Sequence, residues 1–208
     1  MRLVAGLLLL ACSRGATIRE YSDAFERASL GSDWADTGGG YRIEGARLVA
    51  RNAYNHPLWL LPRLPRDAEI TFDVSSHSPE GDIKVEVWGD GESAATDKGA
   101  YTATGYVFIF GGWKNRTGIP AVDQLTVLAR LNEHGEDRKV RTDMKVVPGR
   151  RYRWRIARKG ARLSWWIDER LVFQLDDPSP LQGAGHEHFG FNDWQAELRF
   201  DNLRIQAL

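Results

Sequence analysis

The stretch that decides the fold is residues 151–175, which read RYRWRIARKGARLSWWIDERLVFQL. Apolar and basic side chains alternate along its first part, where the apolar residues are Tyr152, Trp154 and Ile156. A turn at Lys159-Gly160 leads into a second alternating segment, and another tight turn follows at 168–170. Alternation with a period of two is typical of a β-strand with one buried face. The stretch therefore predicts consecutive antiparallel hairpins.

The same pattern recurs along the chain, and no run from residue 23 onwards has the periodicity of a helix. Segment 106–110 is apolar on both faces, so we expect it in the middle of a sheet. Other short segments separated by turn residues are 41–48, 69–74, 83–88, 125–131, 188–191 and 198–205. About a dozen strands of this kind predict an all-β fold, a two-sheet antiparallel jelly-roll sandwich.

Several parts of the chain resemble concanavalin A-like lectin/glucanase domains. They are the opening with Leu30-Gly31-Ser32-Asp33-Trp34, the hairpin 162–173 and the closing Phe200-Asp201-Asn202-Leu203-Arg204-Ile205. Segment 105–115 is similar to a bacterial subgroup found near polysaccharide-degrading systems. The resemblance covers about residues 23–206 and implies a jelly-roll whose concave sheet and rim loops meet the ligand. Lectins, hydrolases, lyases and adhesion modules share this fold, so function has to be argued from the site.

The N-terminus predicts export and a lipid anchor. Arg2 precedes the short apolar run 3–10, which is typical of a signal peptide and too short to span a bilayer. Cys12 is the single cysteine, and 9–12 resembles a bacterial lipobox. We therefore expect a signal peptide at 1–11, lipidation of Cys12, a tether at 12–22 and the domain at 23–208. Ser13 favours the outer membrane in the lipoprotein pattern, and an ordinary signal peptide is the alternative.

The charge pattern gives no indication of a nucleic-acid partner. The chain holds 28 basic and 28 acidic residues, so no global field attracts a polyanion. Eleven basic residues gather between Arg138 and Arg162, but arginines there alternate with apolar residues, as on the outward face of a strand. Binding of an anionic polysaccharide or of lipopolysaccharide by this face is an alternative.

Three groups of side chains are candidates for a carbohydrate partner. An aromatic ring stacks on the apolar face of a sugar, while carboxylates, amides and charged side chains bind its hydroxyls. Lys84, Glu86 and Trp88 are expected on one face of a strand, opposite Ile83, Val85 and Val87. The predicted ligand-binding residues are Glu86 and Trp88 in the first group, Trp113, Asn115 and Arg116 in the second, and His188, Asn192 and Trp194 in the third.

Neither a metal nor another cofactor is predicted. His186 and His188 have a spacing that could share a metal on a strand, but no third ligand is near in the sequence. Hydrogen bonding to sugar hydroxyls is the favoured role for His188.

The sequence carries no recognised catalytic motif. The two glutamates flanking an aspartate on one strand that family 16 glycoside hydrolases carry are absent, because the acidic residues near Glu86 have a different spacing. Carbohydrate binding is the favoured function. The alternatives are a carbohydrate-active enzyme, resembling keto-disaccharide hydrolases, and a structural or adhesive lipoprotein whose concave face is filled by its own side chains.

Overall fold

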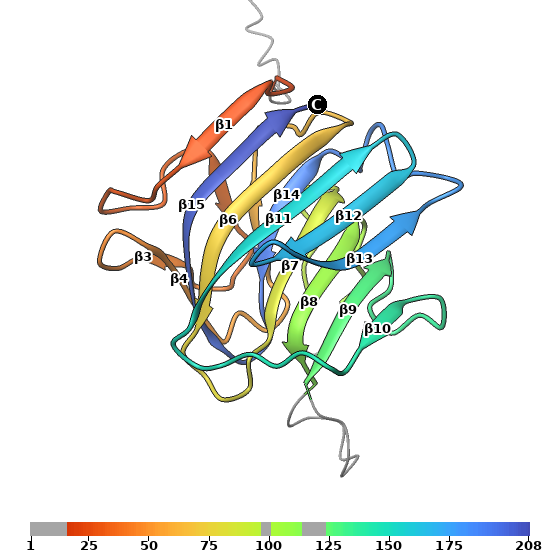
Figure 1. Cartoon of the computed structure of the whole chain (residues 1–208). Helices are drawn as coiled ribbons and strands as arrows, with labels where there is room; N and C mark the ends of the chain where they lie inside the picture. The colour runs from red at the N-terminus through yellow and green to blue at the C-terminus, as the bar shows by residue number, and fades with distance from the viewer. Residues whose placement is uncertain (1–15, 97–100, 114–123) are drawn as a thin grey trace, which may run out of the picture.

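The structure is a computed structural model that describes residues 16–96, 101–113 and 124–208 (Figure 1). These ranges contain fifteen β-strands. The strands are β1 (Glu20–Asp23), β2 (Trp34–Asp36), β3 (Arg42–Ile43), β4 (Leu48–Arg51), β5 (Leu58–Leu60), β6 (Ala68–Ser76), β7 (Ile83–Gly89), β8 (Tyr106–Gly112), β9 (Leu125–Arg130), β10 (Lys139–Arg141), β11 (Arg151–Lys159), β12 (Arg162–Ile167), β13 (Arg170–Asp176), β14 (His188–Asn192) and β15 (Glu197–Ala207). Across this described part, no helix has the length and apolarity needed to cross a membrane.

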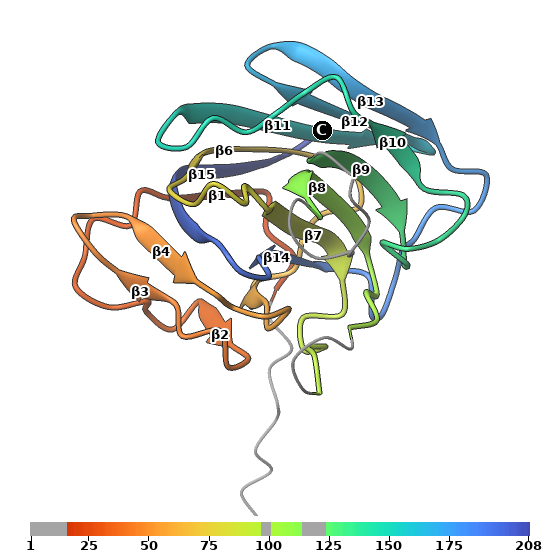
Figure 2. The ribbon, with the colours of Figure 1, turned by 90° about the horizontal axis from the view of Figure 1, so that it is seen from below.

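The strands form two antiparallel sheets that lie face to face, as the view in Figure 2 shows. One sheet has eight strands in the order β13-β12-β11-β6-β15-β4-β3, with β1 also paired to β15. The other has seven strands in the order β10-β9-β8-β7-β14-β5-β2. Each sheet buries one face against the other, which is the β-sandwich arrangement. The prediction of an all-β, two-sheet jelly-roll is confirmed.

The predicted hairpin builds the centre of the eight-stranded sheet. β11 pairs with β12 on one side and with β6 on the other, so its apolar residues face the seven-stranded sheet. Trp154 is fully buried, and its ring lies 4.6 Å from that of Trp165. β8 lies between β7 and β9, as its two apolar faces predicted.

The predicted boundary between tether and domain is too late. Glu20–Asp23 forms β1 and pairs with residues 203–206 of β15, and Thr17 forms a parallel bridge with Arg63. β1 is held by backbone hydrogen bonds, and Glu20, Tyr21 and Ser22 are not buried, so apolar alternation could not reveal it. The chain is therefore part of the sandwich before residue 23.

Candidate functional site

The outer face of the seven-stranded sheet is the surface that points away from the core of the sandwich. On β7, Ile83, Val85 and Val87 belong to the core, which turns Lys84 and Glu86 to the outer face. A second, smaller apolar cluster covers the neighbouring part of this face, and its buried members are Ala103, Val107, Ile109, Val127 and Ala129. Polar side chains on the outer face are therefore surrounded by apolar ones.

Glu86 lies at the centre of this face and is fully buried. Its Oε1 accepts hydrogen bonds from the backbone amides of Thr104 (2.7 Å) and Gly105 (2.6 Å) and from the Thr104 hydroxyl (3.1 Å). Oε2 has no hydrogen-bond partner. Burial raises the pKa of Glu86 to about 7, although the hydrogen bonds from Thr104 and Gly105 favour the charged form. Near neutral pH this carboxyl can therefore either donate or accept a hydrogen bond.

Lys84 is the buried cation of the outer face. Its Nζ lies 2.8 Å from Asn55 Oδ1 and 2.8 Å from Glu133 Oε2. Burial alone would lower the pKa of Lys84, but the negative charges of Glu133 and Asp82 raise it above its usual value. Glu133 comes from the segment 131–138 that links β9 to β10, so this segment folds back across the sheet to reach β7.

Asn192 and Asp193 extend the polar group at the end of β14. Asn192 pairs with Lys84 across the strands, so the two side chains share the outer face. Asn192 Oδ1 accepts the backbone amide of Asp193 at 2.9 Å, and Asp193 Oδ1 accepts that of Ala53 at 2.9 Å. Asn192 Nδ2 and Asp193 Oδ2 are buried without a hydrogen-bond partner. Burial, and then the nearby charge of Asp82, raise the pKa of Asp193 to about 8.

The loop after β4 is bent sharply to bring Asn55 to Lys84. Tyr54 and Asn55 have φ angles of 52° and 64°, in the left-handed region that non-glycine residues rarely adopt. Backbone amides of both donate to the segment after β14: Tyr54 N to Trp194 O at 3.0 Å and Asn55 N to Asp193 O at 2.9 Å. Strained backbone of this kind persists where its surroundings fix it, and it is frequent at functional sites.

These contacts define the outer-face polar cluster, a name kept below for Asn55, Lys84, Glu86, Glu133, Asn192 and Asp193. Four strands or their flanking loops supply it, and it contains three buried side-chain atoms without a partner, on Glu86, Asn192 and Asp193. Buried polar atoms in folded proteins nearly always have a hydrogen-bond partner, which can be a protein group, an ordered water or a ligand.

Comparison with solved structures finds proteins of the same architecture. The carbohydrate-binding module CBM66 from Bacillus subtilis aligns over 86% of this chain and 98% of its own, with 17% identity and a TM-score of 0.56. The VIP36 exoplasmic/lumenal domain, with Ca²⁺ and Man3GlcNAc bound, aligns over 85% of this chain and 84% of its own, with 12% identity and a TM-score of 0.62. The fold is the β-sandwich of these lectin-type structures.

A third structure comes from work on endo-acting O-glycanases of the human gut microbiota. It aligns over 90% of this chain and 98% of its own, with 10% identity and a TM-score of 0.61. No protein-family model matches the sequence, and no curated protein matches it. At these identities the likeness establishes the lectin-type fold alone.

The lectin-type sandwich brings two of the predicted ligand residues together, because Glu86 and Asn192 lie on adjacent strands of the outer face. Trp88 is not with them. A register shift in the pairing of β14 with β7 falls between His188 and Phe189, opposite Trp88, and Trp88 has a φ of 57°. This bulge turns the indole into the core, where it is 1% exposed. The expectation that Trp88 shares a face with Lys84 and Glu86 is wrong.

Two of the remaining predicted residues, Trp113 and Trp194, have separate neighbours. Trp113 is half-buried, and its ring lies 5.6 Å from that of His134 and 5.4 Å from the Arg138 guanidinium. Trp194 is half-buried and packs edge-on against Tyr54, with ring centroids 5.5 Å apart. Asn115, Arg116 and Cys12 lie outside the described residues.

The two histidines serve separate loops. His188 Nδ1 lies 2.9 Å from Leu60 O, and His186 Nδ1 lies 2.8 Å from Thr104 O. Their rings are thus tied to different segments, and His188 is half-buried at the start of β14, the opposite end of that strand from Asn192.

The arginines of the basic face of β11 form ion pairs with carboxylates of its neighbour β6. Arg151 and Arg153 both form ion pairs with Asp73, and Arg155 lies 3.5 Å from Glu69. The Arg155 guanidinium also stacks 3.6 Å above the ring of Trp166. These arginines therefore have acidic or aromatic partners within the sandwich.

Asp193, which directly follows Asn192, was not among the predicted ligand residues, and the sequence did not indicate Asn55 and Glu133. Both lie in loops, at a distance along the chain from the strand they reach. The run 52–57, with Asn52, Asn55 and Pro57, carries turn residues, and that is the one signal that could have drawn attention to Asn55.

Proposed function

We propose that the protein binds carbohydrate through the outer face of its seven-stranded sheet. One observation carries the proposal: Glu86 Oε2, Asn192 Nδ2 and Asp193 Oδ2 lack hydrogen-bond partners on one face of a lectin-type sandwich. Asn192 Nδ2 is a donor, and the two carboxyls can donate or accept because their pKa values are raised to about 7 and about 8, which suits a sugar with neighbouring hydroxyls. The CBM66 module and the Man3GlcNAc-bound VIP36 domain support carbohydrate as the ligand class.

Binding at this place requires two covering groups to move, the segment 131–138 over Lys84 and the Trp59 ring over Gly190. Glu86 and Asn192 are fully buried, and Lys84 is held under Glu133. In our proposal, the Lys84–Glu133 contact opens and sugar hydroxyls take its place, while the half-buried indole of Trp113 supplies a stacking surface at the margin. A weak apparent affinity is expected, because the free energy of opening the contact is subtracted from the intrinsic binding free energy.

A glycan array tests the proposal. The purified protein should bind at least one saccharide, and Glu86→Gln and Trp113→Ala should each reduce that binding about tenfold or more. Trp166→Ala is the matched control, because Trp166 lies on the other sheet beside Arg155. Absence of binding to a broad panel by a correctly folded protein would instead support a structural or adhesive role.

A carbohydrate-active enzyme is the second candidate function. Two carboxyls of the outer-face polar cluster, Glu86 and Asp193, have their pKa values raised to about 7 and about 8. Displaced carboxyl pKa values near neutrality are suited to general acid–base chemistry and occur frequently at active sites. Release of reducing sugar or formation of a double bond from a polysaccharide panel, lost in both Glu86→Gln and Asp193→Asn, would establish this function in place of simple binding.

We further propose that the protein is a lipoprotein of the outer membrane, anchored through acyl chains on Cys12. The support is the sequence of residues 2–13 alone. Several acyl chains on one residue would give a stable anchor. Labelling with radioactive palmitate should be lost in Cys12→Ser, and the labelled protein should fractionate with the outer membrane. The paired arginines of β11 support the absence of a nucleic-acid partner.

A further inference from the structure

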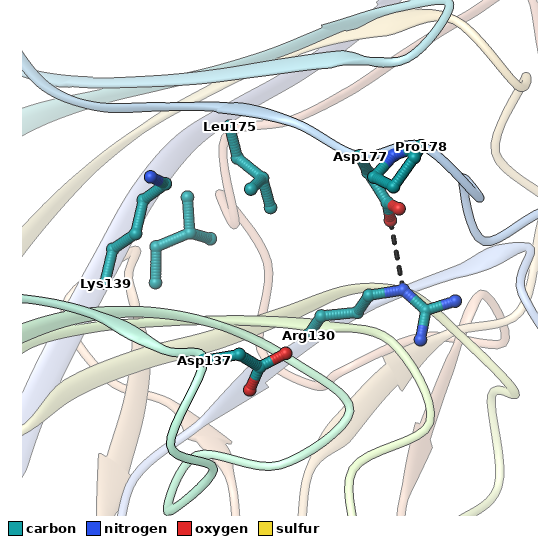
Figure 3. A pocket seen from close by; sticks show the side chains of 7 residues that line it. Arg130, Asp137, Lys139, Leu175, Asp177 and Pro178 are labelled. Atoms are coloured by element: carbon teal, nitrogen blue, oxygen red, sulfur yellow. Dashed lines mark hydrogen bonds and ion pairs between the residues drawn. The ribbon is translucent and has the colours of Figure 1, made fainter.

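A pocket of about 170 Å³ opens between the edges of the two sheets (Figure 3). It lies between β10 and β13, which are the terminal strands of the two sheets. Where two packed sheets diverge at an edge, the side chains that face each other are left uncovered. Here those side chains line the pocket. Its lining residues are Leu128, Arg130, Asp137, Lys139, Leu175, Asp177 and Pro178.

One wall of the pocket is fixed by hydrogen bonds. Asp177 Oδ2 accepts from Tyr106 Oη at 2.5 Å and from Arg130 Nε at 3.0 Å, the contact drawn in Figure 3. Arg130 Nη2 also donates to Ser179 O at 3.1 Å. Burial would raise the pKa of Asp177, but the hydrogen bonds from Tyr106, Ser179 and Arg130 hold it below its ordinary value. The Arg130–Asp177 pair is therefore a preorganised part of the wall.

The other side of the pocket presents one donor and one acceptor. The side chains of Lys139 and Asp137 both line the hollow, and within the described ranges neither side chain has a hydrogen bond or an ion pair within 4 Å. Leu175 lies between Lys139 and Asp177 in Figure 3, and Leu128 is the second leucine of the lining. The pocket thus combines an apolar floor with an ammonium group and a carboxylate at its rim.

We infer that this pocket is a second ligand site, which takes one neutral sugar ring. The two cations and two carboxylates of the lining balance, so no net field selects an anion or a cation. A pyranose places C–H groups on Leu128 and Leu175, accepts a hydrogen bond from Lys139 and donates one to Asp137. The volume is below the ~300–1,000 Å³ of sites for drug-sized ligands, which limits the occupant to a single ring.

Chemical-shift mapping by NMR tests this site. The ¹⁵N-labelled protein is titrated with the methyl glycosides of glucose, galactose and mannose, each up to its solubility limit. We expect at least one of them to shift the backbone amides of Leu128, Lys139 and Leu175 in a saturable way. No saturable shift at these amides with any of the three glycosides would overturn the inference.

Variants separate this site from the outer face. Leu175→Trp should fill the pocket and abolish the shifts, and Lys139→Ala should weaken binding about tenfold. Lys159→Ala, at the exposed end of β11, is the matched control and should bind as the unmodified protein does. Shifts that survive both Leu175→Trp and Lys139→Ala would contradict the assignment, and if Leu175→Trp does not fold, Lys139→Ala decides alone.

The same titration distinguishes failure of this inference from failure of the proposed function. Binding at the outer face is reported by the amides of Val107 and Ile109 and should be lost in Glu86→Gln, whereas the pocket shifts should persist in that variant. Either set of shifts can be present without the other, so each site stands or falls separately.

Discussion

The ammonium group of Lys84 lies 2.8 Å from Glu133 Oε2, and the two side chains are only 4% and 9% exposed. An ion pair so far from water has lost most of the hydration of both charges. It joins β7 to the segment 131–138, so it connects the centre of the seven-stranded sheet to the loop that crosses it.

Removing one partner of this pair should destabilise the protein strongly. Lys84→Met leaves Glu133 buried without its cation, and we expect the free energy of unfolding to fall by about 3–5 kcal/mol. Adding Glu133→Gln to Lys84→Met should restore part of that loss, because no uncompensated charge is left. Urea denaturation of the three proteins measures both effects.

Arg162 and Asp176 provide the matched comparison. Their ion pair is also 2.8 Å long, but both side chains are 60% exposed. Arg162→Met should therefore change the free energy of unfolding by less than about 1 kcal/mol. Similar losses for Lys84→Met and Arg162→Met would show that burial of the first pair is unimportant.

The buried carboxyl of Glu86 should make stability depend on pH. Its pKa is raised from the ordinary value of 4.5 to about 7 in the folded protein. Between these values the folded state keeps a proton that the unfolded chain has released, so this contribution to stability is complete below pH 4.5 and is lost as pH rises towards 7. The effect is on the order of 3 kcal/mol.

Glu86→Gln removes this titration and retains an oxygen that can accept from Thr104 and Gly105. The free energy of unfolding of the variant, relative to the unmodified protein, should therefore rise with pH from 4.5 to 7 and then level off. Asp193 titrates in both proteins and cancels in the difference. Parallel pH profiles would contradict the raised pKa of Glu86.

The strands and the two-sheet fold could be predicted because alternation reports the local environment of each strand. The prediction placed Lys84 and Glu86 on one face of β7 correctly. It failed two residues later, since the bulge at Trp88 depends on how β14 pairs with β7, and pairing register is not contained in a period-two pattern.

The site was predicted only where its residues lie on strands. Glu86 and Asn192 follow from alternation, but Asn55 reaches Lys84 through a left-handed backbone, and Glu133 reaches it through a loop that folds back. Both contacts depend on tertiary structure, because Asn55 lies 29 positions before Lys84 in the chain and Glu133 lies 49 positions after it. Loop geometry of this kind has no periodic signal in the sequence.

Trp88 should behave as a core residue. Its indole Nε1 donates to Pro65 O at 3.1 Å, and its ring packs edge-on against Tyr106 at 6.2 Å. Trp88→Ala should lower the free energy of unfolding by about 3–5 kcal/mol, whereas Trp113→Ala, at a half-buried ring, should cost less. Saccharide binding measured on the folded fraction should persist in Trp88→Ala and fall in Trp113→Ala.

Trp59 covers the outer face at Gly190 and leaves no room for a side chain there. A Cβ added at Gly190 would lie 2.8 Å from Cε3 of the Trp59 ring, and the buried indole is fixed by a 3.0 Å hydrogen bond from Nε1 to Ser93 O. Gly190→Ala should therefore lower the free energy of unfolding by about 1–3 kcal/mol through overpacking. Trp59→Leu removes the ring, so in that background Gly190→Ala should hardly change the free energy of unfolding. A double-mutant cycle should therefore give a coupling free energy about as large as the loss caused by Gly190→Ala alone. If Gly190→Ala lowers the free energy of unfolding equally in the unmodified protein and in Trp59→Leu, the Trp59 ring does not exclude a side chain at position 190.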